Sequence, residues 1–208
     1  MERQNWDERY AAKEPTFVRE PNALVVEEAG SLAPGRALEL AAGEGRHALW
    51  LASLGWDVVA VDFSEVAVRR AHDRARREAL PVHFLVADVH TLRLPPARFD
   101  LVLATFFHPR PTERVTLYPA MAQALAAGGS LLLVSYDKAN LTEGAGGPKD
   151  PDFLLEPPVL AAELEELGLE VTRADTVRTR ATTVDGEEVD VVNAVIRARS
   201  PRPAGEAG

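Results

Sequence analysis

Short apolar runs alternate with longer stretches of helical period from residue 36 onward. The short runs lack a clean polar–apolar alternation, which is typical of strands covered on both faces. We predict strands at Ala37–Leu40, Val58–Val61, Val82–Val86, Leu101–Ala104 and Leu131–Ser135. Helices are expected at His47–Leu54, Glu65–Ala79 and Thr112–Ala126, the last kinked or split by Pro119. Alternating β and α units of this length predict a parallel sheet with right-handed crossovers.

The two ends of the chain depart from this alternation. Residues 2–13 and Ala23–Gly30, the latter capped by Asn22, predict a helical N-terminal cap over about residues 1–30. After a helix at Val159–Leu167 that Gly168 ends, two strands, Glu170–Thr182 and Glu188–Arg199, are joined at Asp185-Gly186. Asp-Gly between two strands is a strong hairpin signal.

The fold class expected is therefore α/β, a Rossmann-like three-layer sandwich. Its sheet is seven-stranded and mostly parallel, and it ends in an antiparallel hairpin. We expect a single domain over residues 1–199 and a disordered tail over residues 200–208, which is rich in Pro, Gly and Ala.

The main candidate site is a glycine loop at the end of the first predicted strand. Gly43 and Gly45 let the backbone turn sharply there and approach a ligand closely. The second strand ends in Asp62, and a carboxylate in that place can accept both ribose hydroxyls of an adenosine. This order of strand, glycines, helix, strand and acid predicts a nucleoside-binding crevice.

Two cofactor classes fit such a crevice, since Gly43, Gly45 and Ala48 also match the dinucleotide pattern G-x-G-x-x-A. Three features favour S-adenosylmethionine over a nicotinamide or flavin. Glu39 lies at the end of the first strand, Asp88 follows the third strand, and the sheet ends in a hairpin in place of a second mononucleotide-binding half. A nicotinamide-dependent oxidoreductase remains the alternative enzyme class.

The motifs together resemble those of class I S-adenosylmethionine-dependent methyltransferases, namely Leu38–Gly45, Asp62, Ala87-Asp88, Phe99–Val102 and Gly128-Gly129. Two further segments, Trp6–Tyr10 with Pro21-Asn22 and Gly146–Asp152, are similar to small methyltransferases of the tellurite-resistance type. The resemblance covers about residues 5–199. It implies that the protein is an enzyme that transfers a methyl group from S-adenosylmethionine.

The resemblance also implies roles for individual residues. Glu39, with backbone at Ala41 and Gly43, would hold the methionine end of the cofactor, to which Thr105 would also offer its backbone. Gly45 would be a further cofactor-binding residue of the loop. Asp62 would bind the ribose, Phe63 and Val89 would lie near the adenine, and Asp88 would accept the adenine amino group. Ala41 stands where the family has a glycine, and its methyl group is expected to be tolerated at a negative φ.

Weaker candidates lie outside this core set. Trp6, Tyr10, Arg46, Phe106 and Phe107 are candidates for cofactor contact, and His108 is a candidate general base. The glycine-rich segment Glu143–Asp152 is either a lid over the acceptor or a disordered surface connection. The other histidines show no ligand spacing, so no metal site is predicted.

The composition of the chain disfavours several classes of binding partner. The formal net charge of −9 disfavours nucleic acid, and the absence of cysteine excludes thiol chemistry. No apolar stretch has the length of a membrane helix, so a cytoplasmic protein without a membrane partner is expected. Methyl transfer from a sulfonium is an in-line displacement that depends mainly on positioning, so the residues do not identify the acceptor. A small molecule is expected, and a non-catalytic S-adenosylmethionine-binding sensor remains open.

Overall fold

A computed structural model describes residues 3–13 and 15–202 of the chain. It contains the expected seven-stranded mixed sheet, which is mostly parallel, has helices against it and ends in a hairpin. The chain divides into two compact units, Met1–Leu92 with Arg180–Val189 and Arg93–Thr179 with Asp190–Gly208. Within the described residues, no helix is both long and apolar enough to cross a bilayer. The single domain and the cytoplasmic location stay predictions.

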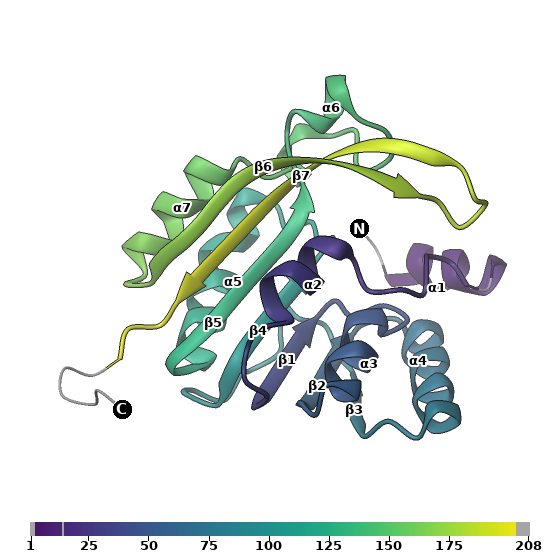
Figure 1. The fold of residues 1–208 in the computed structure, drawn as a ribbon, viewed down its shortest axis with the longest axis horizontal. Helices are drawn as coiled ribbons and strands as arrows, with labels where there is room; N and C mark the ends of the chain where they lie inside the picture. Colours follow the sequence, from purple (N-terminus) through teal and green to yellow (C-terminus); the bar gives the residue numbers. More distant parts are fainter. Residues whose placement is uncertain (1–2, 14, 203–208) are drawn as a thin grey trace. The chain divides into compact units, whose positions relative to one another are not determined.

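The first unit is built on three parallel strands in the order β3-β2-β1 (Figure 1). They are β1 (Arg36–Leu40), β2 (Asp57–Asp62) and β3 (Val82–Val86), paired so that Glu39 faces Ala60 and Asp62 faces Val86. The crossover helices α3 (Arg46–Ser53) and α4 (Glu65–Glu78) lie on the same face of these strands, as right-handed connections require. The carboxyl ends of β1 and β2 are therefore neighbours.

Local sequence signals explain where the helices of the first unit begin. The Ser64 side chain accepts the Ala67 N–H and caps α4, and the Asn22 side chain accepts the Leu24 N–H and caps α2 (Ala23–Ala29). The N-terminal helix α1 (Arg3–Ala12) contacts α4 through Asp7, which accepts hydrogen bonds from the Ser64 hydroxyl and the Val66 N–H. The chain thus has two helices before β1, and their role as a cap stays a prediction.

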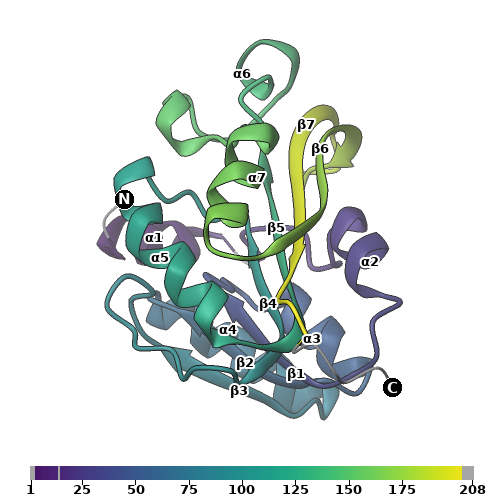
Figure 2. The same cartoon turned by 90° about the vertical axis from the view of Figure 1, so that its left-hand side faces the viewer.

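The second unit holds β4 (Phe99–Thr105), β5 (Leu125–Tyr136), β7 (Glu188–Arg199) and β6 (Glu170–Thr182), adjacent in that order. β4 pairs with β5 in parallel and β7 pairs with β5 antiparallel. The helices α5 (Pro111–Ala124) and α7 (Pro157–Glu166) lie on one face of these strands (Figure 2). They bury Leu117, Met121, Leu160 and Leu164 there.

Two element boundaries in the second unit differ from the prediction. Pro119 does not split α5, which is continuous from Pro111 to Ala124, and a kink at Pro119 stays a prediction. Val115, whose carbonyl lacks the helical donor that Pro119 cannot supply, is a 73% exposed residue. β5 begins at Leu125, not at Leu131, because a bulge around Gly128 (φ 75) lets Phe99 pair with Leu125 before the regular register resumes.

The C-terminal hairpin is confirmed, with its turn at the expected place. The Thr183 N–H donates to the Glu187 carbonyl, and Gly186 has a φ of 84, which favours glycine. Asp185 at this tip forms an ion pair of 2.6 Å with Lys13, which belongs to the same unit. Beyond β7, Ser200 exchanges backbone hydrogen bonds with Gly128 and Gly129. Residues 203–208 of the predicted tail lie outside the described residues.

Candidate functional site

The loop between β1 and α3 has a left-handed backbone at every second residue. Ala41, Gly43 and Gly45 have φ values of 54, 56 and 74. The loop is fastened to β2 because the Ala42 N–H donates to the Val61 carbonyl at 3.0 Å. The expectation of a negative φ at Ala41 was therefore wrong, and its methyl group carries a steric cost of about 1–2 kcal/mol. The loop keeps its shape despite that cost.

Both glycines of the loop are needed for close packing as well as for their φ. A Cβ on Gly45 would lie 3.0 Å from the Phe84 ring and 3.1 Å from the Ala71 methyl, so only glycine lets α4 and β3 approach the loop this closely. A Cβ on Gly43 would lie 2.7 Å from the Tyr10 hydroxyl. Gly43 thus accommodates a side chain from the N-terminal helix.

Asp62 connects the end of β2 to the glycine loop. Its side chain is 5% exposed, and its two oxygens accept the Gly43 N–H at 2.7 Å and the Ser64 N–H at 2.9 Å. Burial raises the pKa of Asp62, although these two hydrogen bonds oppose the shift; the nearby Glu39 and Asp7 carboxylates raise it further. Each carboxylate oxygen has a second lone pair, so Asp62 can still accept from a ligand.

Glu39, at the end of β1, is 1% exposed. Its Oε1 lies 3.0 Å from Nδ1 of His47, in the first turn of α3. Its Oε2 is buried and has no hydrogen-bond partner among the described residues. A buried, unpartnered carboxylate oxygen is costly, so this arrangement favours a ligand with a positively charged donor.

Tyr10 and Trp6, both weaker candidates, belong to an aromatic cluster with Phe17 in the first unit. The ring centroids of Trp6 and Tyr10 are 5.7 Å apart, those of Tyr10 and Phe17 are 6.2 Å apart, and the Arg9 guanidinium lies 5.0 Å from the rings of Trp6 and Phe17. Burial raises the pKa of Tyr10 far above its usual value, and the Asp62 and Glu44 carboxylates add to the rise. The Tyr10 hydroxyl is therefore protonated at physiological pH, beside Gly43.

Glu44 holds the segment after α1 against the glycine loop. It accepts the Thr16 N–H at 2.9 Å and forms an ion pair with Arg70 of α4 at 3.2 Å. Arg70 in turn donates to the Lys13 carbonyl at 2.8 Å. The N-terminal segment is thus attached to the loop by polar contacts as well as by the Tyr10 packing.

The remaining predicted residues of the first unit follow β2 and β3. Phe63 and Val89 are half-buried and Asp88 is exposed. The Ala87 N–H donates to the Asp62 carbonyl at 3.0 Å, which places Asp88 just beyond the end of β2. Asp88 accepts the His90 N–H at 2.9 Å with Oδ1. Arg46 is the first residue of α3, directly after the glycine loop.

Thr105, Phe106, Phe107 and His108 belong to the second unit, at the end of β4. Thr105 is buried, and Phe106 has a φ of 50 and packs edge-on against Tyr136 with centroids 5.2 Å apart. The His108 ring stacks on Tyr136 at 5.8 Å, and its Nδ1 lies 3.2 Å from the Ser135 hydroxyl. Burial lowers the pKa of His108 to about 4, although a hydrogen bond with the Phe153 backbone opposes the shift.

The glycine-rich segment Glu143–Asp152 is held at several points within the second unit. The short helix α6 (Asn140–Glu143) precedes it and the short 3-10 helix η1 (Pro151–Phe153) closes it. The Asn140 side chain donates to the Gly146 carbonyl at 3.2 Å and accepts the Val192 N–H at 2.9 Å. Arg110 binds Asp150 at 3.1 Å and lies 4.3 Å from the Phe153 ring. The segment is thus tied to its own unit by hydrogen bonds and an ion pair.

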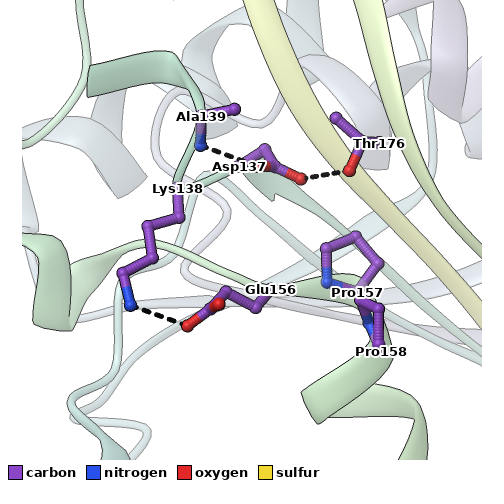
Figure 3. Close-up of a pocket in the computed structure, with 7 residues that line it drawn as sticks. All are labelled: Asp137, Lys138, Ala139, Glu156, Pro157, Pro158 and Thr176. Atoms are coloured by element: carbon purple, nitrogen blue, oxygen red, sulfur yellow. Dashed lines mark hydrogen bonds and ion pairs between the residues drawn. The ribbon is translucent and has the colours of Figure 1, made fainter. Parts of the chain in front are cut away.

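A pocket of about 400 Å³ lies elsewhere in the second unit (Figure 3). Its side chains bind one another: Asp137 accepts from the Ala139 N–H and the Thr176 hydroxyl, and Lys138 pairs with Glu156 at 2.8 Å. None of the predicted site residues lines it. In the described part of the chain, no group of three or more acidic or histidine side chains could hold a metal.

The structure thus brings Glu39, Gly43, Gly45 and Asp62 together with Tyr10 in the first unit. Sequence reasoning missed the contacts of His47 and Glu44. His47 was examined only for metal-ligand spacing, whereas its position in the first turn after the glycine loop was the available signal. Glu44 lies inside the glycine loop, but its partners come from residues 13–17 and Arg70, which no local pattern connects.

Comparison with known proteins gives the same assignment as the motifs. Residues 37–129 match the family model described as a methyltransferase domain. The carboxy-S-adenosyl-L-methionine synthase of Pseudomonas putida is 37% identical over 52% of this chain and 51% of its own length. The probable S-adenosyl-L-methionine-dependent methyltransferase TehB of Haemophilus influenzae is 27% identical over 61% of this chain and 46% of its own length. The chain thus spans about half the length of these relatives.

Solved structures show the same fold. The crystal structure of TehB superposes with a TM-score of 0.72 at 20% identity, covering 93% of this chain and 67% of TehB. The Burkholderia thailandensis 1,6-didemethyltoxoflavin-N1-methyltransferase, with its substrate and S-adenosylhomocysteine bound, gives 0.71 at 20% identity over 96% of this chain and 87% of that one. Residues 37–129 thus match a methyltransferase domain model, and the chain is similar in sequence to S-adenosylmethionine-dependent methyltransferases and shares the fold of TehB.

Proposed function

We propose that this protein transfers a methyl group from S-adenosylmethionine to a small-molecule acceptor. The observation that carries the proposal is the pair of buried carboxylates, Glu39 and Asp62, on either side of the left-handed glycine loop. The hydrogen bonds described for them come from two backbone N–H groups and from His47. Buried carboxylates favour a ligand with cationic and hydroxyl donors. S-adenosylmethionine has an ammonium, a sulfonium and two ribose hydroxyls.

Each residue has a role consistent with its contacts. Glu39 offers Oε2 to the methionine ammonium, and Asp62 uses its remaining lone pairs for the ribose hydroxyls. Asp88 has one oxygen bound to the His90 N–H, and the other is available to the adenine amino group. Phe63 and Val89 offer half-buried apolar surface for the adenine. The role of Thr105 stays a prediction from the resemblance.

The donor supplies a methyl group that is already activated on a sulfonium and is transferred by in-line displacement. The protein's part is to bind, orient and exclude water, which is why no catalytic dyad is needed. Tyr10 and the segment tethered by Glu44 cover the glycine loop and thus shield it from solvent. A role for His108 as general base stays a prediction; at neutral pH its ring is uncharged and held by Ser135 and Phe153.

A small acceptor is supported by two observations. The net charge of −9 disfavours a nucleic acid, and the structural neighbour from Burkholderia thailandensis has 1,6-didemethyltoxoflavin bound. The chain spans only part of its curated relatives, so the acceptor itself is not inferred from them.

The experiment is methyl transfer from S-adenosylmethionine carrying a radiolabelled methyl group to a panel of small acceptors. We expect label in at least one acceptor, and S-adenosylhomocysteine as the co-product. Tight S-adenosylhomocysteine binding with no transfer to any acceptor would favour the sensor. Binding of NADH in place of S-adenosylhomocysteine would favour the oxidoreductase.

A further inference from the structure

His47 has two buried contacts that connect separate parts of the first unit. The residue is 1% exposed and lies in the first turn of α3. Its Nε2 lies 3.2 Å from the backbone N–H of Asn22, the residue that caps α2. Its Nδ1 lies 3.0 Å from Oε1 of Glu39 at the end of β1. A single ring thus joins two helix starts to the strand that leads into the glycine loop.

These contacts determine the tautomer of the ring. A backbone N–H can only donate, so Nε2 of His47 must be an unprotonated acceptor. The ring proton is then on Nδ1, where it donates to Glu39 Oε1. Burial lowers the pKa of His47, in agreement with a neutral ring. Glu39 therefore has no cationic partner in this contact.

The consequence concerns the second oxygen of Glu39. Because Oε1 is held by the His47 ring, the carboxylate is fixed in one orientation, and Oε2 is left buried without a described hydrogen-bond partner. A fixed carboxylate binds an ammonium with a smaller loss of side-chain freedom than a mobile one. The charge would then be compensated by the ligand and not by the protein.

We propose that His47 is a positioning residue for the methyl donor, holding Glu39 by Oε1 so that Oε2 receives the ammonium of the methionine end. The inference rests on the proposed function. It adds a residue that does not touch the donor but determines how well its amino-acid end is bound. It also makes Asn22, through its backbone N–H, part of the support of that end.

Two ligands separate this role from simple packing. S-adenosylhomocysteine carries the amino-acid end, whereas 5′-methylthioadenosine has the same nucleoside without it. We expect His47→Leu, measured by isothermal titration, to weaken S-adenosylhomocysteine at least tenfold and to change 5′-methylthioadenosine less than about twofold. His47→Asn, whose amide can donate to Glu39 in place of Nδ1–H, should restore most of the loss.

A double-mutant cycle tests whether His47 acts through Glu39. In a Glu39→Gln background, His47→Leu should cost little further S-adenosylhomocysteine affinity. Equal losses for both ligands in folded His47→Leu, or additive losses in the cycle, would overturn the proposal.

A measurement on the unmodified protein covers the case in which the variants fail to fold. Proton–nitrogen correlation spectra of the histidine rings should show His47 with its proton on Nδ1 at pH 7, and a proton on Nε2 would overturn the proposal. If the wild type binds neither ligand, the proposed function fails, while the ring spectrum still decides whether the contact between His47 and Glu39 exists.

Discussion

At the scale of single residues, the contact between Tyr10 and Gly43 determines how the N-terminal helix covers the glycine loop. A Cβ at position 43 would lie 2.7 Å from the Tyr10 hydroxyl and 3.7 Å from the ring carbon that bears it. Removing the hydroxyl therefore removes the clash, whereas the unfavourable φ of 56 stays. The two effects can be separated by mutation.

We predict that Gly43→Ala costs about 1–3 kcal/mol more stability in the wild type than in Tyr10→Phe, because only the wild type has the clash. The cost shared by both backgrounds, about 1–2 kcal/mol, is that of the left-handed backbone. Urea unfolding of the four proteins in the cycle measures both terms. Equal costs in the two backgrounds would show that Tyr10 does not lie over the loop.

Ala41 is another left-handed residue of the loop, and unlike Gly43 it carries a Cβ that makes this backbone conformation strained. We predict that Ala41→Gly is neutral or stabilises the protein by up to about 1 kcal/mol, because relief of strain at φ 54 exceeds or matches the entropy gained by the unfolded chain. Ala42→Gly, next to it and without a positive φ, is the matched control and should destabilise by about 0.5–1 kcal/mol. If both substitutions destabilise equally in thermal melts, Ala41 is not strained.

At the scale of elements, the end of β4 is held by the His108 ring, whose contacts depend on its being neutral. The folded-state pKa of about 4 is below the unfolded value of about 6.5, so the unfolded chain binds more protons between these pH values. Stability contributed by the neutral ring is therefore complete above pH 6.5 and declines as the pH falls toward 4.

We predict that this decline amounts to about 2 kcal/mol at pH 5, and that His108→Gln, which cannot titrate, lacks it. Denaturant unfolding at pH 7 and pH 5 gives the difference between the two proteins. His47 and Asp62 are present in both proteins, so their own titration cancels in the comparison. An identical pH dependence for wild type and variant would contradict the burial of His108.

The glycine-rich segment Glu143–Asp152 is the second element with a testable role. Gly146 and Gly147 have nearly the same φ, 72 and 71, but only a Cβ on Gly147 would meet the Tyr136 ring, at 2.9 Å. The two positions thus share the backbone strain and differ in the ring contact. The lid stays a prediction, and the ion pairs of Arg110 are weak enough to open.

We predict that Gly147→Ala lowers amide-exchange protection in residues 143–152 and lowers turnover more than S-adenosylhomocysteine affinity, while Gly146→Ala has the smaller effect. A lid should also gain protection when S-adenosylhomocysteine and acceptor are added together. Exchange that ligands leave unchanged, together with normal turnover in Gly147→Ala, would make this segment a plain connection.

At the scale of the whole molecule, the fold class and the strands of the sheet could be predicted because buried parallel strands are continuous apolar runs. The ends of strands and helices were less predictable, above all at the start of β5, where Gly128 forms a bulge. The residues before Leu131 indicate a turn, but the bulge at Gly128 includes them in β5. Pro119 was expected to kink or split a helix that is continuous from Pro111 to Ala124.

The residues of the site likewise divide into those that the sequence predicts and those that it does not. Glu39, Gly43, Gly45 and Asp62 were predictable because they occur in the order that a strand–loop–helix–strand unit requires. The φ of Ala41, the ring of His47 and the Tyr10–Gly43 contact were not predictable, because each depends on a neighbour that is distant in sequence or on the backbone imposed by the loop.

The central claim is that the buried carboxylates of the first unit bind S-adenosylmethionine, and isothermal titration with S-adenosylhomocysteine tests it most directly. Asp62→Ala is the test variant, and Asp57→Ala, which alters an exposed carboxylate at the other end of β2, is the control. We predict micromolar binding to wild type and Asp57→Ala, no comparable binding of NADH, and at least a tenfold loss in Asp62→Ala, since each charge-assisted hydrogen bond contributes about 1.5–3 kcal/mol. Wild-type affinity in a folded Asp62→Ala protein, or binding of NADH without S-adenosylhomocysteine, would contradict the account.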